Sequence, residues 1–289
     1  MELLESHTVL PLENPVRLSE YVIGVFNTIT SRQGMKKAIK KGWVMVNEEA
    51  AETGRFLVGG EVITLFKPEI SSDQSIAKLK VEVCYEDDYL AVIHKPAGVL
   101  VSGNKLKTIY NALPFNLQVS QQVGALSRPA PVHRLDFPTS GLLLVGKTSS
   151  AIIALSKMFE KKTIQKTYFA VAIGKMEKEG FIDLAIAEKQ AETNYKVLET
   201  VNSERFEFLN LVELKPLTGR RHQLRIHLSE IGNPILGDKD YGKPGLILNG
   251  KGMYLHASGL KFHHPVSGEY LEFNLKIPKK FSKIFSHSN

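Results

Sequence analysis

HRLDFPTSG, residues 133–141, stands between the proline-rich RPAP of residues 128–131 and the apolar LLLV of residues 142–145. A loop of turn-forming residues that leads into a buried strand can hold reactive groups rigidly. Asp136 is the carboxylate in this loop, and it has several polar neighbours in the sequence: His133, Arg134, Thr139 and Ser140. These residues alone leave two interpretations open, a catalytic carboxylate or an aspartate that closes the loop by accepting backbone hydrogen bonds.

Apolar runs typical of strands outnumber helical patterns on both sides of this loop. The expected strands cover residues 81–85, 90–94, 142–145, 167–173, 206–214 and 270–277. One helix is expected to begin near Ser149 or Ser150, and a second to follow Thr218 and end at Gly232. The second helix should turn three residues inward: Leu224, Leu228 and Ile231. Residues 102–130 carry no readable pattern. Long strands with few helices predict an α+β domain on a mixed or antiparallel sheet.

The N-terminal part reads as a separate small unit with two helices and two strands. Its first apolar stripe recurs at helical spacing: Leu18, Val22, Val25 and Ile29. Ser31 is the expected N-cap of a second helix that buries Met35, Ala38 and Ile39. The expected strands are residues 43–46 and 61–66.

The second helix of this small unit is densely basic. Five cations fall within ten positions that contain no acid: Arg32, Lys36, Lys37, Lys40 and Lys41. Such a cluster is typical of a solvated helix face or of a surface that binds a polyanion, and its density favours RNA contact. Residues 69–78 are polar and aperiodic, which predicts a linker. The expected organisation is therefore an N-terminal domain at 1–68 with its core at 17–66, the linker, and a larger domain at 79–289.

Composition narrows the function classes. The 289 residues carry a formal net charge of +7, which favours polyanionic partners through counterion release. Cys84 is the only cysteine, so disulfide frameworks and cysteine-rich zinc sites are excluded. No apolar run approaches the roughly 18 residues that a membrane span requires. The first residues lack the pattern of a secretory signal. We expect a cytoplasmic protein that is monomeric and has no membrane partner.

Five stretches, in order, are similar to the RluA-type RNA pseudouridine synthases. HRLDFPTSG resembles the HRLD-x-x-TSG signature of that family. HKPAGVLVS resembles its NKPAG segment, with His94 in place of the commoner Asn, and QKTYFAVAIG resembles its tyrosine-bearing strand. The remaining two are LTGRRHQLRIHLSEIGNPILGDKDYG and LHASGLKFHHPVSGE, which resemble the family's arginine-bearing helix with its following loop and a late segment. Together these stretches span most of residues 79–277.

The resemblance implies a role for several residues. Asp136 would be the essential carboxylate, Tyr168 the aromatic residue against the target base, and Arg225 the guanidinium paired with Asp136. Arg134 would hold the RNA around a flipped nucleotide. Arg220 and His222 stand shortly before Arg225 in the same stretch and are expected to contact RNA. Arg221 departs from the family, which more often has a small hydroxyl residue there.

The N-terminal unit resembles the alpha-L RNA-binding motif over about fifty residues. The pattern is VRLSEY…SRQGMKKAIKKGWVMVNEE…VGGEVITLF, and Ser19 stands where that motif commonly carries Asp. An alpha-L module is commoner among family members that act on ribosomal RNA. The resemblance therefore implies large-subunit ribosomal RNA as the substrate, with transfer RNA as the alternative.

The implied reaction breaks the N1–C1′ bond of a uridine, rotates the uracil and forms a C5–C1′ bond. Every substrate atom is retained, so no cofactor is expected. Asp136 could attack C1′ or remove the C2′ proton to give a glycal, and the residues do not separate these routes. Either route needs an ionised carboxylate, which a nearby guanidinium favours over desolvation. The Tyr168 ring can stack on uracil, and its hydroxyl can assist proton removal from C5.

Two other classes of function remain. One is an RNA-binding protein that has lost activity, which the presence of Asp136, Tyr168 and Arg225 disfavours. The other is a metal-dependent RNA hydrolase, for which His222, His227, His263 and His264 are candidate ligands. Their spacing fits neither a helical i, i+4 pair nor a zinc finger, and no acid stands directly beside them in the sequence, so no metal is expected. His133 is expected to brace the loop that carries Asp136.

Overall fold

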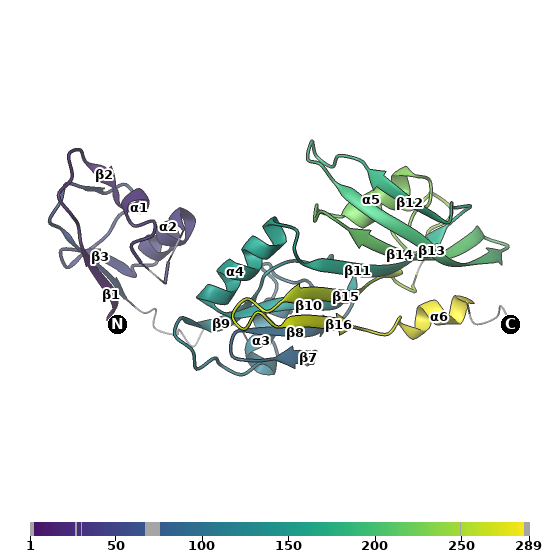
Figure 1. The fold of residues 1–289 in the computed structure, drawn as a ribbon, viewed down its shortest axis with the longest axis horizontal. Coiled ribbons are helices and arrows are strands. Elements are labelled where there is room, and N and C mark those ends of the chain that lie inside the picture. Colours follow the sequence, from purple (N-terminus) through teal and green to yellow (C-terminus); the bar gives the residue numbers. More distant parts are fainter. Residues whose placement is uncertain (1–2, 27, 30, 67–75, 249, 286–289) are drawn as a thin grey trace. The chain divides into compact units, whose positions relative to one another are not determined.

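The computed structural model describes the chain except residues 1–2, 27, 30, 67–75, 249 and 286–289. It divides into two compact units, Met1–Gln74 and Ser75–Asn289, called here the N-terminal unit and the C-terminal unit (Figure 1). The predicted linker at 69–78 lies outside the described residues as far as Ser75. Among the described helices, none combines the length and the apolar character needed to cross a lipid bilayer.

The N-terminal unit packs two helices against small antiparallel sheets. Its elements are β1 (Leu3–Thr8), β2 (Val16–Arg17), α1 (Leu18–Tyr21), α2 (Arg32–Lys40), β3 (Val44–Val46), β4 (Glu49–Ala50), β5 (Phe56–Leu57) and β6 (Val62–Phe66). Four strands pair in the order β1-β6-β3-β4, and β2 pairs with β5. Strands β3 and β6 match the predicted strands closely, whereas β1 was not predicted.

The first predicted helix is much shorter than its apolar stripe. Helix α1 ends at Tyr21, and residues 22–25 form a turn in which Gly24 has a φ of +81°. Val22 is nevertheless buried, and Val25 and Ile29 pack on the same core. A turn that folds back over the core can bury apolar residues at helical spacing without being a helix. Helix α2 forms as predicted, because the Ser31 side chain caps it by accepting from the Gly34 amide at 3.0 Å.

The C-terminal unit is built on one large mixed sheet. Its elements are β7 (Glu82–Glu86), β8 (Leu90–Lys95), α3 (Ile109–Asn116), β9 (Ala125–Pro131), β10 (Ser140–Thr148), α4 (Ser149–Glu160), β11 (Gln165–Ile173), β12 (Glu179–Asp183), β13 (Glu192–Ser203), β14 (Glu207–Pro216), α5 (Gln223–Glu230), β15 (Leu255–His263), β16 (Tyr270–Asn274) and α6 (Lys279–Phe285). The main path of the sheet runs β12-β13-β14-β11-β15-β10-β8-β7, with β9 and β16 paired beside it. Only β10 and β15 pair in parallel among the described strands, so the expected α+β class is confirmed.

Strand β10 explains why the apolar run 142–145 shows no alternation. Leu143 and Val145 pack into the core cluster that includes helix α3, while Leu142 and Leu144 pack into the cluster that includes helix α4. A strand covered on both faces can be apolar at every position. The loop of residues 133–139 leads directly into this strand, so its C-terminal end is anchored in the core.

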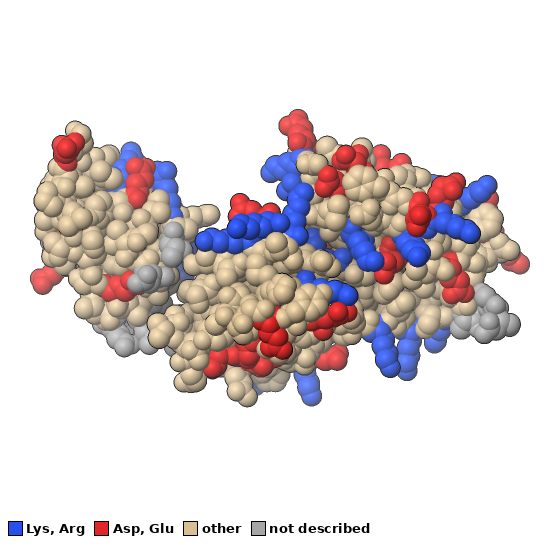
Figure 2. Space-filling view, viewed as in Figure 1, with Lys and Arg blue, Asp and Glu red and all other residues tan. Residues whose placement is uncertain are grey.

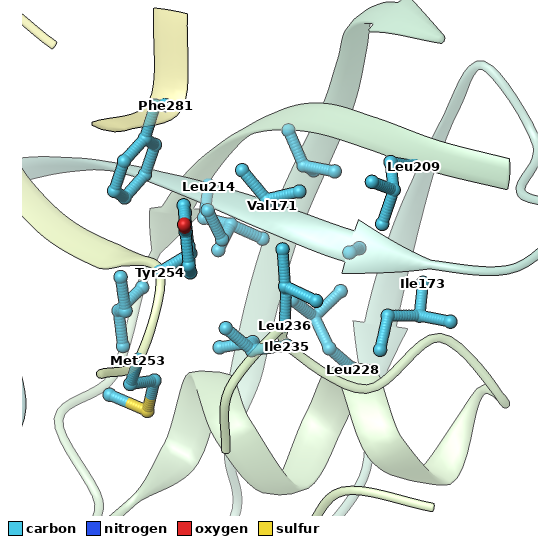
Figure 3. Packing of buried hydrophobic residues seen from close by; sticks show 14 of the residues in the cluster. Val171, Ile173, Leu209, Leu214, Leu228, Ile235, Leu236, Met253, Tyr254 and Phe281 are labelled. Atoms are coloured by element: carbon cyan, nitrogen blue, oxygen red, sulfur yellow. The ribbon is translucent and has the colours of Figure 1, made fainter. Parts of the chain in front are cut away.

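Helix α5 lies against strands β11 and β14. Figure 3 shows Leu228 of α5 directed toward Val171, Ile173 and Leu209 of these strands. Leu224 joins the same core, but Ile231 is 39% exposed and lies just beyond the helix, so the prediction that it turns inward was wrong. The other buried side chains of this helix are polar: Gln223, Arg225 and His227.

Several boundaries differ from the predictions for local reasons. Helix α4 is capped by Thr148, whose hydroxyl accepts from the Ala151 amide at 3.2 Å, rather than by Ser149 or Ser150. Helix α5 begins at Gln223, because His222 has a left-handed φ of 56° and ends the preceding loop. Helix α3 was missed because Pro114 lies inside it and its apolar pattern is weak.

Candidate active site

A cavity of about 570 Å³ lies where the loop of residues 133–139, strand β11 and the start of helix α5 meet. Its walls combine apolar and basic side chains with a carboxylate. The lining includes Val132, Arg134, Leu135, Asp136, Phe159, Ile164, Lys166, Tyr168, Leu217, Arg220, Arg221, His222, Arg225 and Leu255. The volume is within the range of about 300–1,000 Å³ that suits a small ligand. Asp136, Tyr168 and Arg225, to which the resemblance gives roles in one reaction, all line this cavity.

Asp136 sits in a loop that is fixed at both ends. The Thr139 amide donates to the Asp136 carbonyl at 3.1 Å and closes a turn. Gly141 follows with a φ of +126°, and a Cβ there would lie 2.1 Å from the Ala257 carbonyl oxygen, so only glycine fits. The Asp136 side chain is 15% exposed, and it lines the cavity.

Lys95 is a buried residue that supports the same loop. This fully buried lysine donates through Nζ to the carbonyls of Val99 at 2.8 Å and Pro96 at 3.0 Å, and it lies 3.5 Å from that of Phe137. Burial lowers the pKa of Lys95 to about 8, and the charge of Asp136 acts in the opposite direction. The ammonium therefore adds positive charge behind the carboxylate.

Arg225 is held by a pair of aspartates that the sequence analysis did not single out. Its Nε and Nη2 donate to the two carboxylate oxygens of Asp238, both at 2.6 Å, and Nη2 also contacts Asp240 at 2.6 Å. These bonds leave Nη1, which lies 3.7 Å from Oδ2 of Asp136. That separation is an ion pair but not a hydrogen bond. The two aspartates thus fix the plane of the guanidinium that faces Asp136.

His222 also faces Asp136. Its Nε2 lies 3.7 Å from Oδ1 of Asp136, and its Nδ1 lies 2.9 Å from the Tyr241 hydroxyl. Burial lowers the pKa of His222, while the charge of Asp136 works against that shift. The residue expected to contact RNA is therefore placed against the carboxylate itself. The absence of a neighbouring acid in the sequence was misleading here and at His264, which lies 3.0 Å from Asp87.

Tyr168 reaches the cavity from strand β11 at an irregularity in the sheet. The pairing between β11 and β15 shifts by one residue between Thr167 and Tyr168. Such a bulge changes the direction in which a side chain points. Burial first, and the charge of Asp136 second, raise the pKa of Tyr168 well above its ordinary value. The phenol is therefore a hydrogen-bond donor at neutral pH.

Two further residues organise the cavity wall. His133 accepts from the Leu144 amide through Nε2 at 2.9 Å, which confirms the predicted bracing of the loop. Burial and then Lys166 lower the pKa of His133 to about 3, so the ring is neutral. Lys166 donates to the Thr218 carbonyl at 3.0 Å, and burial lowers its pKa to about 8.

The mouth of the cavity is basic. Arg134, Arg220 and Arg221 are exposed residues that line it, together with Lys162. Figure 2 shows Lys and Arg side chains gathered over helix α4, with a few acidic side chains beside them. An anionic chain that enters the cavity would meet these cations before it reaches Asp136.

The cations of helix α2 form a separate surface on the N-terminal unit. Lys36, Lys37, Lys40 and Lys41 are exposed and fall within about 140° of the helix circumference, opposite the buried side. Lys41 lies over the Trp43 ring at 4.6 Å. Arg32 differs from them because its guanidinium is paired with Glu20 at 2.5 Å.

The missed residues had only weak signals in the sequence. Asp238 and Asp240 form an Asp-x-Asp pair after the arginine-bearing helix, and such a pair suits a guanidinium with several donors. Lys95 and Lys166 lie within or beside strands, where nothing in the local pattern says that a lysine is buried.

Comparison with known proteins shows which of them this chain is similar to. A model of the family described as RNA pseudouridylate synthase matches residues 89–230. An uncharacterized RNA pseudouridine synthase of Aquifex aeolicus is 34% identical, with 89% of each chain covered. The ribosomal large subunit pseudouridine synthase D of Vibrio cholerae is 34% identical, with 91% of this chain and 88% of the relative covered.

A solved structure agrees. Human RNA pseudouridylate synthase domain containing 1 superposes with a TM-score of 0.57 at 26% identity, covering 69% of this chain and 84% of the human one. The relatives, the fold and the cavity point to the same chemistry. The chain belongs to the RluA-type RNA pseudouridine synthases and is an RNA-modifying isomerase.

Proposed function

We propose that this enzyme isomerises uridine in large-subunit ribosomal RNA, and that Asp136, Tyr168 and Arg225 carry the reaction. The observation that carries the proposal is their convergence on one cavity, with Arg225 Nη1 3.7 Å from the Asp136 carboxylate. The ribosomal substrate is supported by relatives named ribosomal large subunit pseudouridine synthase C or D. Transfer RNA is the alternative substrate.

The cavity requires the target nucleotide to leave its stack. A cavity of about 570 Å³ beneath a basic mouth can receive one extruded nucleoside but not a helix. Arg134, at the mouth and next to the loop's buried Leu135, is placed to occupy the space that the nucleotide vacates. Arg220 and Arg221 are placed to hold the flanking phosphates.

Asp136 would act at the sugar. Attack of its carboxylate on C1′, or removal of the C2′ proton, breaks the N1–C1′ bond and leaves the electron pair on uracil. Rotation of the base then brings C5 to C1′. The C5–C1′ bond forms as the Asp136–C1′ bond breaks or, on the glycal route, as a proton returns to C2′, and the C5 proton is then lost while N1 gains one. Substrate and product are isomers, so the atoms balance. Tyr168, a donor beside Asp136, can stack on the base as it turns.

Arg225 would keep the carboxylate in place rather than react. Its two bonds to Asp238 fix the guanidinium before the substrate arrives, so little reorganisation is needed during the reaction. The remaining Nη1 is directed at Asp136. His222, on the other oxygen of the same carboxylate, limits its rotation.

The N-terminal unit would supply affinity as an alpha-L RNA-binding domain, and the enzyme would act as a monomer. Lys36, Lys37 and Lys40 form no ion pair among the described residues, so their charges are available to phosphates. The C-terminal unit would then carry out the reaction, and the N-terminal unit would bind RNA phosphates independently of sequence.

Pseudouridine mapping across all RNA of a deletion strain tests the substrate. We expect one or a few positions of the large ribosomal RNA to lose pseudouridine and to regain it with the wild-type gene. Loss confined to transfer RNA would overturn the ribosomal assignment but not the reaction. Unchanged modification in every RNA would favour a protein that only binds.

A further inference from the structure

A second, smaller cavity lies on the other side of the residues His133 and Arg134. Its volume is about 240 Å³, and both residues line it as well as the larger cavity. The rest of its wall comes from Val101 and Ser102, Tyr110, and the end of strand β9. It is smaller than the pockets of about 300–1,000 Å³ that hold drug-sized ligands, so it suits a single flat ring.

The aromatic wall of this cavity is fixed in advance. Tyr110 lies in the first turn of helix α3, and its amide donates to the Val101 carbonyl at 2.9 Å. The Arg128 guanidinium lies 5.1 Å from the centre of its ring and donates to Asn111 at 2.8 Å. Arg128 is only 8% exposed, whereas Tyr110 is 36% exposed. The ring is therefore held from the interior and accessible from the surface.

The chemistry of the lining matches a nucleobase. An exposed aromatic ring can stack on any base, the Ser102 hydroxyl can donate or accept, and Arg134 can stack or donate. The lining contains no carboxylate, and the adjoining loop carries the exposed Lys105 and Lys107. An apolar ligand would form no ion pair with these lysines, whereas a nucleotide carries a phosphate that could.

We propose that this cavity is a second base-binding subsite, which takes an unpaired nucleobase of the RNA close to the target uridine. The inference rests on the proposed function, because it assumes that the target occupies the larger cavity. Arg134 then stands between two extruded bases. Extrusion of the target deprives its neighbour of a stacking partner, and Tyr110 replaces that partner.

Abasic substitutions in a substrate RNA test the subsite. The probe is a stem-loop around the mapped uridine, with the base removed at each of two positions on either side. For the wild type, one abasic position should lower kcat/KM by about 5-fold to 150-fold, the range of a lost base–aromatic stack. Tyr110→Ala should lower kcat/KM by a similar factor on the intact RNA. Removal of the base at that position should then lower the kcat/KM of Tyr110→Ala little further. Tyr110→Phe should behave as the wild type.

Phe115→Ala is the matched control, because Phe115 is an exposed aromatic residue on the same helix that does not line the cavity. This variant should have the wild-type kcat/KM on both the intact and the abasic RNA. Should Tyr110→Ala unfold, Ser102→Trp fills the cavity from an exposed position and must give the same pattern. Equal abasic penalties for the wild type and the variants would overturn the subsite. A wild type that forms no pseudouridine in any RNA would overturn the proposed function itself.

Discussion

The surroundings of Arg225 and of the α2 lysines differ in how charge is held. Arg225 is 2% exposed and is fixed by two aspartates that lie 13 and 15 residues further along the chain. Lys36, Lys37 and Lys40 are exposed, and one amphipathic helix presents all three. A charge that must orient a reacting group is held by several partners, whereas a charge that grips phosphates needs only a common face. We therefore expect loss of the partners of Arg225 to lower the rate of turnover, and loss of the α2 lysines to weaken RNA binding.

The largest loss of turnover is expected from changes to the aspartates that hold Arg225. Asp238→Asn removes the charge that receives two 2.6 Å bonds, so the guanidinium should shift and kcat should fall about 100-fold. The same change should lower the free energy of unfolding by about 3 kcal/mol, because it breaks a buried pair. Single-turnover rates and denaturant unfolding measure both effects.

Asp240→Asn is the matched control for that change. Its carboxylate contacts the same Nη2 at 2.6 Å but is 65% exposed. We expect a loss of kcat of about 5-fold or less, as for an exposed ion pair. Equal losses for the two variants would mean that burial does not decide which aspartate positions Arg225.

The α2 lysines should affect binding and not turnover. Changing Lys36, Lys37 and Lys40 to Ala should reduce the slope of log affinity against log salt by about 2 to 3, since each phosphate contact contributes about 0.7–0.9. The rate at saturating RNA should stay unchanged. Filter binding at several salt concentrations measures the slope.

A control with the same change in net charge separates a specific surface from general attraction. Lys276, Lys279 and Lys283 are exposed lysines near the C-terminal end of the other unit. Their replacement by Ala should leave the slope nearly unaltered. A slope that falls equally in both triple variants would show that helix α2 has no special part in binding.

At neutral pH the smallest effect is expected from His133. In the folded protein the pKa of His133 is lowered to about 3 from its ordinary value of 6.5. Between these values the unfolded chain binds the proton and the folded chain does not, so stability decreases as pH falls from about 6.5 toward 3. His133→Gln should remove up to about 1.4 kcal/mol per pH unit of that dependence. Unfolding of both proteins at a series of pH values provides the test, and parallel curves would contradict it.

The two regions also differ in how far the sequence predicts them. Helix α2 and its exposed lysines followed from an N-cap at Ser31 and a 3.6-residue period, which are local signals. Asp136, Tyr168 and Arg225 were identified through a resemblance, because their convergence depends on contacts between distant strands. The bulge that directs Tyr168 and the pairing of Arg225 with Asp238 are tertiary features that no local pattern encodes.

Local patterns failed where tertiary packing replaced secondary structure. The stripe from Leu18 to Ile29 predicted a helix, but Gly24 turns the chain and the core still buries Val22. Ile231 fitted the inward period of helix α5, yet the helix ends before it. In both cases the apolar residues recur at helical spacing, but the backbone does not continue as a helix through all of them.

Release of tritium from C5-labelled uridine in the mapped RNA tests the role of Asp136 most directly, because the C5 hydrogen is lost when the new bond forms. Asp136→Asn keeps the size of the side chain and removes its charge. We predict that it binds the RNA with wild-type affinity and releases no tritium. Tritium release by this variant at a rate near that of the wild type would contradict the assignment of Asp136 as the reacting carboxylate.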